Sequence, residues 1–71
     1  MVMHYVVIIE KGQAGYGAYV PDLPGCVAAA DTRDEVRQLI GEAIRLHLAD
    51  LREQGIDWPT VTVSSEVVEV A

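Results

Sequence analysis

The sequence predicts a two-layer α+β domain, in which one long helix packs on a mostly antiparallel sheet in the order β-β-β-α-β. Three observations predict this fold class. β-branched residues fill the first apolar run, prolines and glycines interrupt the segment that follows, and an apolar pattern of helical period extends from Thr32 to Gly55 before a valine-rich segment. Because 71 residues suffice for one domain, residues 1–71 are expected to form a single domain.

Three strands are expected before the helix. Residues 3–11 are rich in β-branched side chains, which favour pleated surfaces, and residues 12–15 contain two glycines of a turn. A second strand at 16–20 completes an antiparallel hairpin and stops at a proline, which cannot donate to a ladder. Proline and glycine at positions 24 and 25 suit the centre of a type II turn, and a short third strand is expected at 26–29.

The helix carries the clearest local signal. Thr32 and Glu35 form a Thr-x-x-Glu capping box at its start, and Gly55 suits the cap at its end. About 22 residues at about 1.5 Å each predict a helix roughly 33 Å long, which is enough to cross a whole sheet face. Its core side is an apolar stripe at helical spacing, made of Val36, Leu39, Ile40, Ala43, Ile44, His47, Leu48 and Leu51.

A final strand is expected at residues 61–70, where valines first alternate with polar residues and then cluster. One helix covers one face of a sheet only, yet the first and last strands carry apolar residues on both sides. A chain of this size buries only about 60% of its unfolded surface, so its core is marginal. We therefore expect a partner surface or a homo-oligomer, either a dimer or a tetramer, with candidate contacts at Val67, Val68 and Val70.

Charge limits the class of partner. Five Lys and Arg face eleven Asp and Glu, which gives a net charge of −6. Such a chain lacks the clustered cations that bind nucleic acid or an anionic membrane surface. A basic protein would be attracted to it, although solubility explains the acidity equally well. No apolar run reaches the roughly 20 residues that a bilayer requires, and no basic region marks a signal peptide, so the cytoplasm is the expected location.

No constellation of catalytic, cofactor-binding or metal-binding residues stands out. The single cysteine, Cys26, excludes an internal disulfide and has no cation near it in sequence, so a buried, inert residue is expected. The only histidines, His4 and His47, are fewer than the three protein ligands of a usual catalytic zinc site. The glycines are dispersed in a hairpin and do not lead into a helix, as a phosphate-binding loop would. We therefore predict no metal, no cofactor and no enzymatic activity.

The segment from Tyr16 to Cys26 is a candidate partner-binding site. Two prolines stiffen it, which lowers the entropy cost of presenting a surface, and Leu23 lies between them at a turn where it is expected to be exposed. The candidate contacts are Tyr16, Tyr19, Pro21, Asp22, Leu23 and Pro24. A rigid connector between two strands, with Asp22 accepting hydrogen bonds from local backbone donors, explains the same residues equally well.

The run Val20-Pro21-Asp22-Leu23-Pro24-Gly25-Cys26 resembles the signature of the HicB-like family, the antitoxin half of a type II toxin–antitoxin pair. The resemblance covers roughly residues 3–60 and continues through Asp31-Thr32, Glu42-Ala43-Ile44, His47-Leu48 and the helix exit from Gly55 to Pro59. It implies a partial ribonuclease-H-like fold and a function, which is to bind and mask a small basic toxin of the HicA-like kind. Catalysis, the cleavage of messenger RNA, would belong to the toxin.

The resemblance leaves three hypotheses. The leading one is a binding module that neutralises a toxin, and it predicts that Leu23→Asp weakens the complex more than the fold. The alternatives are an oligomeric protein-binding domain without a toxin partner and a nuclease remnant of weak activity. Many members of the family carry a second, C-terminal DNA-binding domain; none is expected here, so operator binding is not implied.

Overall fold

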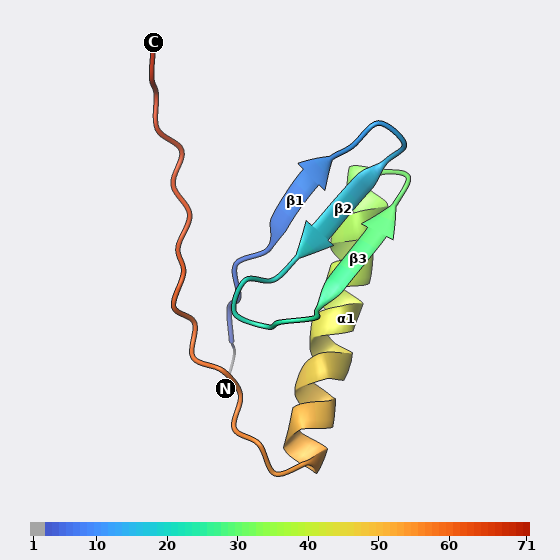
Figure 1. Cartoon of the computed structure of the whole chain (residues 1–71), viewed down its shortest axis with the longest axis vertical. Coiled ribbons are helices and arrows are strands. Elements are labelled where there is room, and N and C mark those ends of the chain that lie inside the picture. The colour runs from blue at the N-terminus through green and yellow to red at the C-terminus, as the bar shows by residue number, and fades with distance from the viewer. Residues whose placement is uncertain (1–2) are drawn as a thin grey trace.

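A computed structural model describes residues 3–71 and contains three strands and one helix. The strands are β1 (Ile8–Lys11), β2 (Tyr16–Tyr19) and β3 (Val27–Ala30), and the helix is α1 (Arg33–Glu53). The strands form one antiparallel sheet in the order β1-β2-β3, and α1 lies against one of its faces (Figure 1). The predicted α+β class, with one long helix on an antiparallel sheet, is confirmed.

The first strand is shorter than the sequence predicts. Its ladder begins where Ile8 pairs with Tyr19, so residues 3–7 lead into β1 without belonging to it. The reason lies on the partner strand, where the chain turns directly after Val20: the N–H of Leu23 donates at 3.0 Å to the carbonyl of Val20. The next residue is a proline, which has no N–H to offer. The bounds of β2 and β3 agree with the predicted strands to within one residue.

The loop between β1 and β2 passes close to the end of β3. Gly12 donates its N–H to the carbonyl of Gly15 at 2.7 Å, and Gly15 has a φ of +151°. A Cβ at Gly15 would lie 2.6 Å from the carbonyl oxygen of Ala30. The position therefore requires glycine for its space as well as for its backbone conformation.

Gly15→Ala is accordingly expected to lower the free energy of unfolding by about 1–3 kcal/mol, the usual cost of a strained backbone position. The matched control is Gly17→Ala, since a Cβ at Gly17 meets no atom within 4 Å. Urea denaturation of the two variants makes the comparison. An equal loss in both would mean that the close approach to Ala30 contributes nothing.

The two ends of α1 are capped largely as the sequence predicts. The Thr32 hydroxyl accepts from the backbone N–H of Glu35 at 3.1 Å and donates to the Glu35 carboxylate at 3.0 Å. In the usual capping box the glutamate carboxylate accepts from the backbone N–H of the cap residue, whereas here it accepts from the threonine hydroxyl. At the other end Gly55 has a φ of +73°, and the backbone N–H of Ile56 reaches the carbonyl of Leu51 at 2.9 Å. These features form a Schellman motif, so the predicted glycine cap is confirmed.

The core lies between the sheet and α1. Its buried side chains are Ala18, Val20, Leu23, Cys26, Val36, Ile40 and Leu48. The predicted helical stripe supplies three of these, whereas Leu39 at its margin stays 42% exposed. Within residues 3–71, no helix combines the length and the apolar character that crossing a membrane requires.

The predicted strand at residues 61–70 is not formed. Residues 56–71, which we call the tail, contain neither helix nor strand and run alongside the body before diverging from it (Figure 1). Val67, Val68 and Val70 are 102%, 70% and 85% exposed. A strand forms only against a partner that satisfies its N–H and C=O groups, and this segment has no such partner in the described chain. The valine pattern therefore predicted a strand that residues 61–70 do not form in the described chain.

Candidate protein-binding surface

One face of the sheet is left uncovered by α1. The register row that contains Ala18 packs into the core on the helix side. Because successive side chains of a strand point to opposite faces, the adjoining row of Ile8, Tyr19 and Val27 lies on the other side. We call this row the open face. Tyr19 is 41% and Val27 65% exposed.

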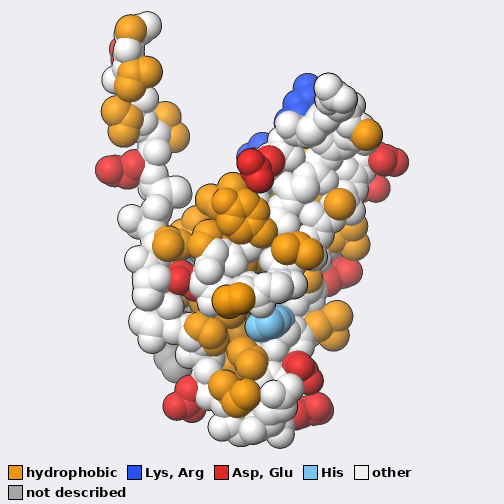
Figure 2. Space-filling view, in the orientation of Figure 1, with side chains coloured by type: hydrophobic (Ala, Val, Ile, Leu, Met, Phe, Trp, Pro, Cys, Tyr) orange, Lys and Arg blue, Asp and Glu red, His pale blue; other side chains and the backbone are white. Residues whose placement is uncertain are grey.

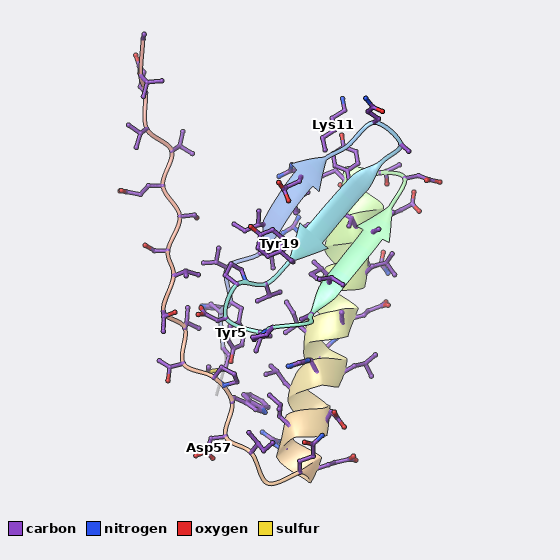
Figure 3. All side chains as sticks on the ribbon, viewed as in Figure 1. Tyr5, Lys11, Tyr19 and Asp57 are labelled. Carbon is purple, nitrogen blue, oxygen red and sulfur yellow. The ribbon has the colours of Figure 1, made fainter. Side chains whose placement is uncertain are left out.

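Apolar side chains gather over the sheet on this side of the molecule, and acidic side chains lie around them (Figure 2). Tyr19 projects from the middle of the sheet, away from α1 (Figure 3). A contiguous apolar surface with a polar margin is typical of a site that another protein covers.

A stiff turn adjoins the open face, because it joins the end of β2 to the start of β3. The N–H of Leu23 donates to the carbonyl of Val20 at 3.0 Å, and the N–H of Cys26 donates to the carbonyl of Leu23 at 3.0 Å. Gly25 has a φ of +84°, as the third residue of a type II turn requires. The predicted turn type is thus confirmed, and both of its prolines, Pro21 and Pro24, are exposed.

Leu23 is not part of this exposed surface. Its side chain is fully buried, with 0% exposure, among the core residues. The expectation that it is exposed at the turn is therefore wrong. Turn residues in the sequence predict where the chain reverses, but the direction of a side chain depends on where the core lies. Here the turn folds over one end of the core, and Leu23 closes it.

Asp22 connects the turn to the tail. Its carboxylate accepts from the backbone N–H of Thr62 at 2.9 Å and from the Thr62 hydroxyl in a short hydrogen bond. The sequence offered local backbone donors as the alternative for Asp22, and the structure places its donors 40 residues away instead. These bonds hold the pKa of Asp22 below its ordinary value, and the bond from the Thr62 hydroxyl has the larger effect. Burial has a smaller effect in the opposite direction.

The lowered pKa gives Asp22 a predictable pH dependence. Because its folded-state pKa is depressed, the carboxylate stabilises the tail contact above the ordinary value of 3.8, and that stability is lost as the pH falls through the folded-state pKa. Thr62→Val removes the hydroxyl, so the carboxyl pKa of Asp22 is expected to rise toward its ordinary value. NMR titration of the side-chain carboxyl carbon measures it. Thr60→Val is the control, and an unchanged Asp22 pKa in Thr62→Val would contradict the assignment.

Three further contacts hold the root of the tail. The Tyr5 hydroxyl donates to the carbonyl of Pro59 at 2.6 Å, and burial raises the pKa of Tyr5, with the charge of Asp22 adding to the effect. The Trp58 indole N–H donates to the carbonyl of Leu48 at 2.9 Å, while the Arg52 guanidinium lies 4.7 Å from the centre of the Trp58 ring. The direction in which the tail leaves the body is therefore fixed by side chains.

The predicted contacts divide between two surfaces. Tyr19 lies on the open face, Pro21 and Pro24 are exposed in the adjoining turn, and Asp22 is half-buried between the turn and the tail. Tyr16 belongs to a register row on the helix side and packs against the core, so it does not join Tyr19. Sequence analysis missed Ile8 and Val27, although the alternation of the hairpin register places both of them beside Tyr19.

The remaining chemical candidates are dispersed. Cys26 is buried, and burial raises the pKa of its thiol, which fits an inert core residue. His4 is exposed, and His47 is half-buried on α1. Among residues 3–71, no group of three or more histidine, cysteine, aspartate and glutamate side chains is arranged to hold a metal ion.

The fold places this chain among small α+β domains with a three-stranded antiparallel sheet and one long helix. A chain of the HicA3 and HicB3 toxin–antitoxin complex has a similar structure, with a TM-score of 0.70 and 28% sequence identity over 84% of this chain and 70% of that one. The HicB-like antitoxins of bacterial toxin–antitoxin systems match residues 5–70. The chain belongs to this family.

Relatives occur in a phage, a bacterium and an archaeon. An uncharacterized 14.9 kDa protein of Haemophilus phage HP1 is 40% identical over 80% of this chain, and a UPF0150 protein of Helicobacter pylori is 48% identical over 62% of it. The chain spans only 43% and 61% of the lengths of these two proteins. A UPF0150 protein of Archaeoglobus fulgidus is 43% identical, and the similarity covers 96% of both chains.

Proposed function

We propose that this chain is an antitoxin module that binds a small basic toxin of the HicA-like kind and masks its active surface. The observation that carries the proposal is the open face, an exposed apolar row on a rigid sheet beside a proline-stiffened turn. Membership of the HicB-like family and similarity to a chain of a toxin–antitoxin complex support the same function. A relation of the body to a partial ribonuclease-H-like fold is part of this proposal.

The charge of the chain supports a basic partner. A net charge of −6 on 71 residues attracts a cationic protein and speeds its association. The apolar open face would then supply most of the affinity, since a few desolvated apolar and aromatic contacts dominate most interfaces. In this division of roles the antitoxin performs no chemistry, and cleavage of RNA belongs to the toxin.

Co-expression tests the proposal. The chain is produced together with the small basic protein encoded beside its gene, and growth is compared with that of cells producing the neighbour alone. Rescue of growth, and a purified complex that weakens as salt rises, are the expected results, because salt screens long-range attraction. A toxic neighbour that this chain neither binds nor neutralises would overturn the proposal. A harmless or absent neighbour would instead favour an oligomeric binding domain without a toxin.

A further inference from the structure

Two unpaired elements lie in the same chain. β1 is an edge strand of the sheet, so one side of its backbone faces no other strand of residues 3–71. Residues 64–71 of the tail, which we call the arm, are all exposed. The arm runs on the β1 side of the molecule but diverges from its own sheet (Figure 1). An extended segment can add as a further strand to the free edge of a sheet, and this chain has both.

The root of the tail fixes the point from which the arm leaves the body. Asp22 holds Thr62, and Tyr5 holds Pro59, so the chain is fixed up to Thr62, two positions before the arm begins. The three exposed valines of the arm, Val67, Val68 and Val70, then stand away from the core. Burying them against another chain is favourable by about 25 cal/mol for each Å² removed from water.

We propose that the arm of each copy pairs with the free edge of β1, and of residues 3–7 leading into it, in a second copy of this chain. In a two-fold arrangement each copy gives one arm and receives one, so both edges are covered and the assembly closes as a dimer. This interface uses the edge of the sheet. It leaves the exposed parts of the turn and the open face available to a different protein, so it does not depend on the toxin hypothesis.

The donor side is tested with Val67→Pro combined with Val68→Pro. These residues are exposed and unpaired, so the prolines break no contact of the body, but they remove two N–H groups from any ladder the arm forms. The matched control, Val67→Thr with Val68→Thr, keeps both N–H groups and the β-branched shape. Light scattering coupled to gel filtration is expected to show a dimer for the full chain and the control. The proline variant is expected to have the mass of one 7.7 kDa chain.

The acceptor side is tested with Val6→Pro. Val6 precedes the ladder, which begins at Ile8, and it is not among the residues packed against the core, so this proline removes no bond of the sheet. Val6→Thr is the matched control. Far-UV circular dichroism checks that each variant keeps its fold. Val6→Pro is expected to be monomeric, as the donor variant is.

Mixing the two proline variants is the decisive measurement. A pair formed from one donor variant and one acceptor variant retains one intact arm-to-edge contact, so dimers are expected to reappear in the mixture and in neither variant alone. Proline variants that both remain dimeric would place the interface elsewhere. A full chain that is monomeric, with its arm amides protected from hydrogen exchange, would show that the arm pairs with its own sheet. Either result would overturn the proposal.

Discussion

Leu23→Asp is expected to unfold the chain. The Leu23 side chain has 0% exposure and is one of the largest buried side chains of the molecule. A carboxylate in its place would have to be buried without a partner or would have to pull the turn off the core. Thermal denaturation followed by circular dichroism is expected to show no cooperative transition. The sequence alone suggested the opposite order of effects, with the complex weakened more than the fold.

A graded series separates burial from charge at this position. Leu23→Ala is expected to cost about 2–5 kcal/mol of unfolding free energy, and Leu23→Met less than about 1.5 kcal/mol, because methionine conserves most of the volume. Pro24→Ala, at an exposed neighbour in the same turn, is the control for local effects. A Leu23→Asp protein with a melting curve like that of the unmodified chain would show that the side chain is not needed by the core.

Tyr19→Asp and Val27→Asp are expected to abolish rescue from the toxin without unfolding the chain. Both side chains are well exposed on the open face, so their loss leaves the core intact. At the centre of an interface, a buried contact of this kind contributes about 2 kcal/mol or more. Each variant is therefore expected to weaken the complex by about 30-fold or more, since about 1.4 kcal/mol corresponds to a tenfold change.

The matched control for the open face is Leu39→Asp. Leu39 is 42% exposed, close to the value for Tyr19, but it lies on α1, which covers the opposite face of the sheet. Calorimetric titration of each variant with the purified toxin gives the affinities, and the unfolding midpoints give the stabilities. Equal weakening by Leu39→Asp and Val27→Asp would mean that added negative charge, rather than the open face, determines the affinity.

Local chemistry in the sequence predicted the elements whose causes are local. The capping threonine and glycine of α1, the type II turn and the glycine turn of the hairpin all depend on residues within a few positions of one another. The contacts that escaped prediction join distant parts of the chain. No local pattern indicates that Asp22 accepts hydrogen bonds from Thr62, or that the Tyr5 hydroxyl reaches Pro59.

In the candidate surface too, features with local causes were predicted and those that depend on distant contacts were not. The proline-rich turn was predicted, but which of its side chains point outward depends on how the turn lies against the core, so the exposure of Leu23 was predicted wrongly. The valine-rich tail was predicted as a strand because its composition favours one. Whether a strand forms depends on a partner edge, and composition does not encode one.

The contacts at the root of the tail also suggest an order of events during folding. The three-stranded meander and α1 are built from short-range contacts, whereas Tyr5 and Pro59 are 54 residues apart. Contacts between neighbouring segments form early, because closing a short loop costs little entropy, and distant contacts form late. The tail is thus the last element to be fixed, after the sheet and the helix have packed together.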